Sequence, residues 1–328
     1  MSITVRPIKE DEVEQFRRTM GVPFGSDPTP ESAERFIKTL EVDRLTAAFD
    51  GSDMVATFGA LTMILTVPGG QLPMAGTTVV TVLPTHRRQG VLREMMDDHL
   101  RDVHKRGEPI AGLWASESSI YGRFGYGVAS ERAQMTLDKQ WARLREPVDI
   151  RGYIRLVDTK EALEIFPDVY QAVAATRPGM LARSDNWWEY RVLLDPEEAR
   201  HGATEHRRAV CSRAGRPVGY VLYRWLPDDA AGTITVQIIE LLGVDSLAER
   251  QLWQFLFGTD LVTSFRYWNQ PVDDSLNWWL EQPRRAQRAV DDALWLRLTD
   301  VPAALSGRKY SAPGSLTIGV QDHFCPWN

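Results

Sequence analysis

The feature that most constrains the fold is a change of hydrophobic period around Gly90. Residues 80–82 end an apolar stretch typical of a strand. After Gly90, apolar residues recur at helical spacing, at Leu92, Met96, Leu100 and Val103. Residues 110–115 then form a short apolar run typical of a buried strand. A strand, a helix and a strand in this order predict a parallel crossover.

The segment before the crossover predicts antiparallel sheet. The expected elements are a strand at 3–7, helices at 10–20 and 31–40, and strands at 45–49, at 54–65 and from Gly69-Gly70 to about Val82. The turn Asp50-Gly51-Ser52 joins two of these strands as a hairpin. A parallel crossover inside an otherwise antiparallel sheet is an α+β (mixed α/β) arrangement. It opens a strand edge where a ligand can enter.

The turn Arg87-Arg88-Gln89-Gly90 has the character of an anion site. It lies between the apolar strand and the start of the helix, where backbone N–H groups are unpaired and carry partial positive charge. Gly90 lets the backbone approach an anion closely, and Arg87, Arg88 and Arg93 can add charge-assisted contacts to phosphates. The alternative is a basic, solvated helix start. The anion site is the favoured interpretation, because without a bound anion three arginines at a helix start would be mildly unfavourable.

Composition bounds the class of protein. The 328 residues predict two or three domains, and a charged fraction of 25% with a hydrophobic fraction of 43% is typical of a soluble globular protein. A net charge of -6 argues against nucleic acid as a partner and weakly favours cationic substrates. Cys211 and Cys325 lack the spacing of a disulfide framework or a metal site. We therefore expect no metal. No apolar stretch is long enough to span a membrane, so we expect a cytoplasmic protein.

The rest of the chain suggests a second module and part of a third. We expect domains at 1–145, 146–285 and 286–328. The second contains a helix at 159–174, a hairpin at Ala214-Gly215, a strand at 233–242 and a helix from Ser246. Its strand-to-helix connector has no Arg-rich, Gly-containing turn, so we expect a similar fold without the phosphate site.

The third segment predicts a strand at 294–298, a helical turn at 301–305 and a strand at 315–320. It is too short to bury a core of its own, so we expect a truncated domain there.

The motif resembles a known family. Arg-x-x-Gly-x-Leu at 87–92, after Val80-Thr81-Val82, resembles motif A of the GNAT acetyltransferases, with Leu92 where the usual form has Gly or Ala. That variant, followed by SESSIYGRFGYG at 116–127, resembles the Eis-like branch (enhanced intracellular survival proteins), which acetylate amines including those of aminoglycosides. A second GNAT-like module, and a sterol-carrier-like domain opening at 292–310, match that branch in order and cover nearly all of the chain.

The resemblance implies acetyl-CoA as cosubstrate and a small-molecule amine as acceptor. The backbone of Val80, Thr81 and Val82 would pair with the pantetheine arm, and Ser116 and Glu117 would complete the cofactor slot. The remaining cofactor-binding residues, around the pyrophosphate, would be Arg87, Arg88, Gln89, Gly90, Val91, Leu92 and Arg93. The family also implies a homohexamer.

Tyr121 matches the general acid of the family. A thiolate leaving group needs a proton, and a phenol with an ordinary pKa near 10 still carries one at neutral pH. The alternative is that the aromatic residues of YGRFGYG only pack against the sheet. The family's general base resembles a C-terminal carboxylate, and because this sequence ends at Asn328 we name no base.

Acceptor binding and catalysis each leave alternatives. Phe24, Asp27 and Glu31, in the loop PFGSDPTPE, could bind cationic amines, but a solvated loop with a helix cap is the favoured interpretation. A non-catalytic scaffold that binds CoA or lipid, and a protein lysine acetyltransferase, are the competing functions.

Overall fold

The computed structural model describes residues 3–27 and 29–328, apart from the side chain of Glu31. Contacts divide the chain into two compact units. The first unit contains the chain up to Ala129, Arg177–Tyr190 and Leu294–Asn328. The second contains Ser130–Thr176 and Arg191–Ala293. Each unit has its own sheet and core.

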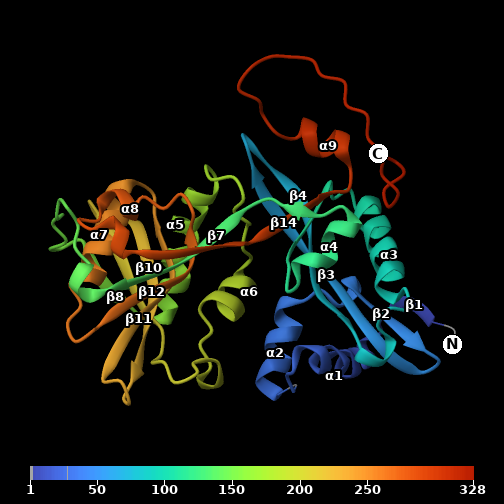
Figure 1. The fold of residues 1–328 in the computed structure, drawn as a ribbon, viewed down its shortest axis with the longest axis horizontal. Helices are drawn as coiled ribbons and strands as arrows, with labels where there is room; N and C mark the ends of the chain where they lie inside the picture. The colour runs from blue at the N-terminus through green and yellow to red at the C-terminus, as the bar shows by residue number, and fades with distance from the viewer. Residues whose placement is uncertain (1–2, 28) are drawn as a thin grey trace. The chain divides into compact units, whose positions relative to one another are not determined.

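The first unit is built on one mixed sheet, drawn mostly in blue and cyan in Figure 1. Its strands in spatial order are β1 (Ile3–Pro7), β2 (Leu45–Asp50), β3 (Asp53–Val67), β4 (Gly70–Val82), β5 (Ile110–Trp114), β14 (Leu294–Leu298) and β6 (Gly127–Val128). Only β4 and β5 pair in parallel, and every other neighbouring pair is antiparallel. The predicted crossover is therefore present.

Helices cover both faces of this sheet (Figure 1). The helical segments of this unit are η1 (Glu10–Glu12), α1 (Val13–Phe24), α2 (Pro30–Thr39), η2 (Val42–Arg44), η3 (Pro84–His86), α3 (Val91–Lys105), α4 (Ser118–Tyr121), η4 (Gly122–Phe124), α6 (Asp185–Trp187) and α9 (Val301–Ser306). On one face, α3 packs Met96 and Leu100 against strand alanines such as Ala48 and Ala75. Helices α1 and α2 pack on the other face around Phe16. The small strand residues let α3 approach the sheet closely.

A β-bulge interrupts β4 close to its end. Thr57 pairs with Thr81 and Gly59 with Thr78, so Val79 and Val80 both lie opposite Phe58. Val79 has a φ of 48°, which is unusual for a β-branched residue. Val79 packs in the core under α1 and α2, whereas Val80 packs in the core under α3. Such a bulge bends its strand and increases its twist.

The second unit repeats this arrangement with different strands. Its sheet, in spatial order, contains β13 (Gln287–Asp292), β7 (Glu131–Asp138), β12 (Ser264–Pro271), β11 (Thr233–Gly243), β10 (Arg216–Asp228), β9 (Arg207–Arg213) and β8 (Ile154–Val157). Strands β11 and β12 form the parallel pair, and β11 also has a bulge, at Ile239. The helical segments are η5 (Lys139–Trp141), α5 (Thr159–Ala174), η7 (Glu197–Ala199), α7 (Ser246–Phe257), α8 (Leu276–Trp279) and η8 (Pro283–Arg285), and η6 (Trp188–Val192) spans the boundary between the units.

The mixed α/β fold class is confirmed. The third segment, however, differs from its prediction in how its strands pair. Leu294–Leu298 is a strand as predicted, but it pairs with β5 of the first sheet instead of starting a separate one. The second predicted strand there, at 315–320, is wrong: these residues form no strand, and all of them are exposed. No neighbouring strand within residues 3–27 and 29–328 offers them backbone hydrogen bonds. A sterol-carrier-like domain opening at 286–328 stays a prediction.

The contact units also begin and end elsewhere than the predicted domains. The units change at Ala129 and Leu294, whereas the sequence predicts boundaries after 145 and 285. The difference arises because β7 and β13 pair with each other and β7 also pairs with β12, which places both in the second sheet.

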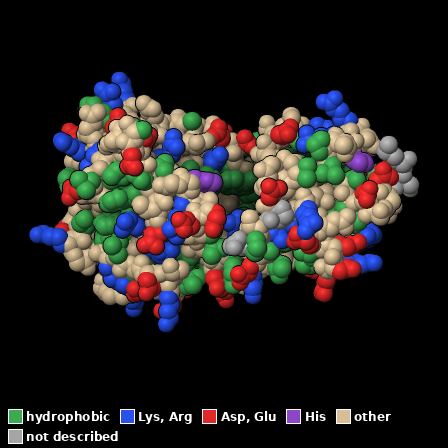
Figure 2. Space-filling model, turned by 90° about the horizontal axis from the view of Figure 1, so that it is seen from below, with side chains coloured by type: hydrophobic (Ala, Val, Ile, Leu, Met, Phe, Trp, Pro, Cys, Tyr) green, Lys and Arg blue, Asp and Glu red, His purple; other side chains and the backbone are tan. Residues whose placement is uncertain are grey.

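The surface mixes charges of both signs. Figure 2 shows acidic and basic side chains interspersed on the face that it presents. Nowhere in the described part of the chain is a helix long and apolar enough to cross a bilayer.

A buried ion pair supports the crossover. Arg44 of η2 makes two hydrogen bonds to the carboxylate of Glu108, at 2.7 and 2.6 Å, and donates a third to Thr62 Oγ1 at 2.7 Å. Each of the two charged residues is 5% exposed. Glu108 lies in the turn that leads into β5, so the pair connects that turn to β3 and η2.

We predict that Glu108→Ala destabilises the first unit by about 3–5 kcal/mol, because it leaves the buried Arg44 guanidinium without its counter-charge. Urea denaturation followed by intrinsic fluorescence measures the effect. Asp97→Ala is the matched control, since it removes a carboxylate from an exposed pair with Arg101 and should leave the midpoint nearly unchanged. Equal midpoints for the two variants would contradict the prediction.

Candidate active site

The parallel pairing of β4 and β5 is short and leaves an open strand edge. The strands pair only from Met74 and Ile110 to Gly76 and Gly112. Beyond Gly76, β4 continues to Val82 with backbone partners on β3 alone among the described residues. An extended ligand chain can hydrogen-bond to such an edge as an added strand would.

The structure places Val80, Thr81 and Val82 on this open part of β4, where the sequence predicted cofactor binding. A threonine pair fixes the backbone there. Thr57 Oγ1 donates to the carbonyl of Val79 at 2.7 Å and lies 2.7 Å from Thr81 Oγ1. Because the Thr57 proton is engaged at Val79, the Thr81 hydroxyl is the donor of the second bond. Side-chain hydrogen bonds thus hold the bulge in place.

The turn at 87–90 leads into a helix without a side-chain cap. Gly90 is the N-cap of α3 in the left-handed region, with φ 88°. Arg88 also has a positive φ, 64°. The N–H groups of Val91 and Leu92, in the first turn, have no backbone acceptor among the described residues. An uncapped helix start with free N–H groups is a ready site for phosphate.

The side chains of this turn are exposed and partly folded back on the chain. Arg87 Nε donates to the carbonyl of Val82 at 3.4 Å, and Gln89 Nε2 donates to the carbonyl of Thr85 at 3.2 Å. Arg93 lies on the first turn of α3, with its guanidinium carbon 5.1 Å from the centre of the Phe324 ring. The predicted turn therefore brings cations and free N–H groups together near the end of β4.

A cavity of about 370 Å³ lies at the N-terminal end of α3. It is lined by Gly90, Arg93, Glu94, Asp97, His323 and Phe324. His323 and Phe324 were not among the predicted site residues. The aromatic residues of FCPWN, at 324–328, could have indicated that this segment packs against the first unit. Two contacts anchor their segment: Arg297 donates to Asp322 at 2.6 Å, and Trp327 Nε1 donates to the carbonyl of Thr299 at 2.7 Å.

In the second unit, side chains contact the helix start and the strand edge of the crossover. Asp245 caps α7 by accepting from the N–H of Ala248 at 2.9 Å, and it also pairs with Arg213. Past the bulge of β11, the N–H of Leu241 donates to the hydroxyl of Tyr267 at 3.2 Å. A carboxylate at the helix start excludes a second anion. This supports the prediction that the second module has no phosphate site.

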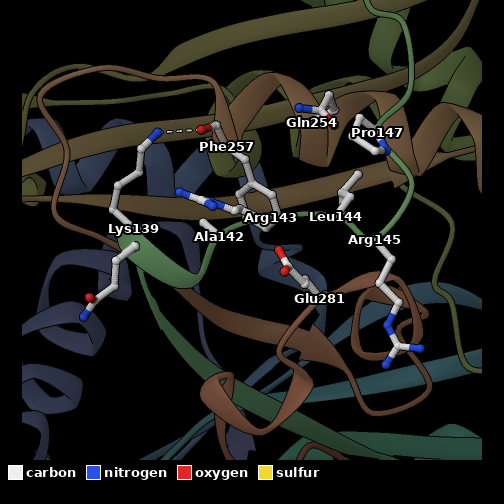
Figure 3. A pocket seen from close by; sticks show the side chains of 10 residues that line it. Lys139, Ala142, Arg143, Leu144, Arg145, Pro147, Gln254, Phe257 and Glu281 are labelled. Atoms are coloured by element: carbon white, nitrogen blue, oxygen red, sulfur yellow. Dashed lines mark hydrogen bonds between the residues drawn. The ribbon is translucent and has the colours of Figure 1, made fainter.

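The second unit has a larger cavity of about 560 Å³, shown in Figure 3. One of the cations that line it, Lys139, donates to the carbonyls of Phe257 and Thr259, at 2.5 and 2.7 Å. Arg145 Nε donates to the carbonyl of Leu280 at 2.8 Å. The cavity therefore lies at the carboxyl end of α7, where the helix dipole is negative. The cavity of the first unit, by contrast, lies at the amino end of α3, where the helix dipole is positive.

Tyr121 lies after β5, at the end of the short helix α4. Ser116 and Glu117 precede it and are exposed, while Tyr121 is 6% exposed. Burial, and secondarily the charge of Glu117, raise the pKa of the Tyr121 phenol above its ordinary value. Its hydroxyl has no hydrogen-bond partner among the described residues, and its ring meets Tyr126 edge to face at 6.0 Å. Tyr121 is thus a protonated phenol with a free donor.

The other candidates are spread more widely. Phe24 and Asp27 are exposed, and the side chain of Glu31 lies outside the described residues. Thr29 caps α2 by accepting from the N–H of Ser32 at 3.2 Å, which confirms the helix cap expected in this loop. Among the described side chains, no group of three or more His, Cys, Asp and Glu is arranged to hold a metal ion.

Both modules match known protein families, and the chain as a whole is similar to known proteins. Residues 4–129 and residues 179–298 each match a family model described as an acetyltransferase (GNAT) domain. The chain is 38% identical over 341 residues to an uncharacterized N-acetyltransferase of Streptomyces coelicolor, covering 100% of this chain and 81% of that protein. It is 33% identical over 321 residues to the N-acetyltransferase Eis of Mycobacterium tuberculosis, covering 95% of this chain and 77% of Eis.

Solved structures agree with these relationships. Eis1 from Mycobacterium abscessus matches with a TM-score of 0.85 at 31% identity, over 99% of this chain and 81% of Eis1. A probable N-acyltransferase from Enterococcus faecalis matches with a TM-score of 0.86 at 22% identity, over 100% of this chain and 80% of that one. The second likeness concerns the fold alone.

We predict that Gly90→Asp weakens CoA binding about tenfold more than Gly90→Asn, because only the aspartate adds a negative charge where the pyrophosphate would lie. Both residues tolerate a positive φ, and a Cβ at this position meets no atom within 4 Å. Isothermal titration calorimetry with CoA makes the comparison. Equal affinities of the two variants would place the anion elsewhere.

Proposed function

The chain belongs to the GNAT N-acetyltransferases of the Eis type, and we propose that it acetylates an amino group of a small cationic acceptor, of the aminoglycoside or polyamine kind. The observation that carries the proposal is the open edge of β4 beside the uncapped start of α3. These two features give one ligand both a strand-like pairing surface and an anion site. That combination fits a pantetheine arm joined to a pyrophosphate.

The residues present fit acetyl-CoA, which supplies the acetyl thioester when bound. The backbone of Val80, Thr81 and Val82 would hold the pantetheine arm. Gly90 and the N–H groups of Val91 and Leu92 would face the pyrophosphate. The guanidinium groups of Arg87, Arg88 and Arg93 would add charge-assisted hydrogen bonds, and Gln89, Ser116 and Glu117 would border the slot.

Tyr121 serves in this proposal as the general acid. Transfer to an amine releases a thiolate, and a proton held on the Tyr121 oxygen neutralises it. The raised pKa keeps the phenol protonated throughout the neutral range. The free hydroxyl of Tyr121 supports this role, because its proton is not committed to another side chain.

The acceptor class rests on the similarity to Eis and on charge. A chain with net charge -6 attracts cations, and Asp27, after α1, presents an exposed carboxylate. A lysine side chain of another protein would undergo the same chemistry. A scaffold that binds CoA without catalysis would retain the binding features and lack turnover.

We predict that the purified chain releases free CoA from acetyl-CoA when an aminoglycoside or a polyamine is present, measured with a thiol reagent. The control is N-acetylated acceptor, which has no free amine and should give only background release. Release with lysine-containing proteins but with no small amine would instead favour a protein acetyltransferase.

We predict that Tyr121→Phe lowers kcat by about a hundredfold or more, because the leaving sulfur loses its proton donor. CoA affinity by calorimetry should change by less than about twofold, since the phenol contributes little to ground-state binding. Tyr153→Phe is the matched control, because Tyr153 is exposed in the second unit. Wild-type kcat in Tyr121→Phe would refute the assignment of the acid. CoA binding without thiol release by any variant or acceptor would favour the scaffold.

A further inference from the structure

A buried chain of hydrogen bonds lies at the point where β4 and β5 separate. Thr77 Oγ1 is 3.0 Å from the hydroxyl of Tyr126 and 2.9 Å from Nε2 of His99. The exposed fractions of these residues are 7% for Thr77, 4% for Tyr126 and 7% for His99. Buried polar groups that are satisfied by one another in this way fix side-chain positions strongly.

The three residues come from the three elements that border the open edge. Thr77 is the first residue of β4 beyond the last parallel pair, Gly76 with Gly112. His99 lies on α3, and Tyr126 lies between η4 and β6, a few residues after α4, which ends at Tyr121. Gly125, just before Tyr126, has φ 85°, and a Cβ there would approach the Arg297 guanidinium to 2.9 Å. The backbone at this turn is therefore tightly constrained.

The hydrogen-bonded side chains of Thr77, His99 and Tyr126 carry no charge near neutral pH. Burial, and secondarily the charge of Arg44, lower the pKa of His99 to about 3, so its imidazole is neutral. Burial raises the pKa of the Tyr126 phenol well above its ordinary value, so it keeps its proton. Neither group changes its protonation state near pH 7, so the hydrogen-bonded residues act as a fixed set of neutral dipoles.

Tyr126 is in direct contact with Tyr121. The two rings meet edge to face, with centroids 6.0 Å apart and an interplanar angle of 69°. Edge-to-face contact of this kind favours a defined ring orientation. Because the Tyr121 hydroxyl has no partner among the described residues, packing of the ring alone sets the position of its oxygen and the direction of its C–O bond. The orientation of the Tyr126 ring, in turn, is set by its hydroxyl at Thr77.

We propose that Tyr126 is a positioning residue for acetyl transfer: its hydroxyl, anchored on Thr77, fixes the ring that holds Tyr121 in its donor orientation. The inference rests on the proposed role of Tyr121 as general acid. Small misplacements of a catalytic group reduce rate strongly, even when the displaced contact makes no bond to substrate. The effect of Tyr126 therefore falls on kcat and is transmitted only through Tyr121.

The test is a double-mutant cycle between Tyr126→Phe and Tyr121→Phe, read as kcat and as KM for acetyl-CoA. Tyr126→Phe keeps the ring and removes the anchor, so we expect kcat to fall about tenfold with KM changed by less than about twofold. In the Tyr121→Phe background, Tyr126→Phe should cause no further fall. A merely structural role would lower kcat by the same factor in both backgrounds.

Two further variants address the anchor itself. Thr77→Val, which removes the hydroxyl, should reproduce the loss seen in Tyr126→Phe, and Thr77→Ser, which keeps it, should restore kcat. Tyr267→Phe is the matched control, because Tyr267 is a buried tyrosine of the second crossover whose hydroxyl is also hydrogen-bonded. It should leave kcat at the wild-type value. Thermal unfolding of each variant checks that its fold is retained.

The outcomes separate this inference from the proposed function. Wild-type kcat in Tyr126→Phe, together with a reduced kcat in Tyr121→Phe, would overturn the positioning role and leave the acid in place. Wild-type kcat in Tyr121→Phe would overturn both. Equal losses from Tyr126→Phe in the two backgrounds would assign Tyr126 to stability alone.

Discussion

The separation of β4 from β5 beyond Gly76 and Gly112 is the constraint on which the rest of the site depends. Two parallel strands that diverge leave backbone groups without partners, which is unfavourable unless a ligand or water satisfies them. The divergence is built into local geometry. The bulge at Val79 bends β4, and Gly59 makes room for it, since a Cβ there would lie 2.8 Å from the Val79 side chain. The Thr57 hydroxyl then holds the Val79 carbonyl in its displaced position.

The two crossovers show that this backbone arrangement does not by itself make a site. Both have a parallel pair, a bulge and a helix that follows. In the second, the carboxylate of Asp245 fills the helix start, and the hydroxyl of Tyr267 engages a backbone N–H past the bulge. Side chains of the protein thus engage the helix start and the strand edge of the second crossover, which lack such contacts in the first. Fold similarity and ligand binding are separable properties, and the difference lies in a few side chains.

The sequence predicted local elements well because they depend on local periodicity. The helix that begins after Gly90, the strand at β5 and the helix at α5 follow from apolar spacing, and the turn at 87–90 follows from charge and glycine placement. The sheet in which a strand pairs is a non-local property. Nothing in the residues 294–298 indicates that they lie beside β5, and the strand expected at 315–320 had the right composition but no neighbour to pair with.

The hydrogen bonds among Thr77, His99 and Tyr126 could not be predicted from the sequence for the same reason. Thr77 is 22 residues from His99 and 49 from Tyr126, so no short motif connects them. His99 nevertheless lies beside Leu100 on the apolar side of α3, and a histidine among core positions was a usable signal.

The same buried environment bears on the acid role proposed for Tyr121. Burial disfavours the charged form of any group, so it removes the proton from a histidine and retains it on a tyrosine. Both effects occur in this core: the pKa of His99 falls to about 3, while the pKa of Tyr121 rises. A histidine buried to the extent of His99 would hold no proton to donate at neutral pH. A tyrosine keeps its proton without needing a neighbouring charge, so the burial of Tyr121 is compatible with the role of acid proposed for it.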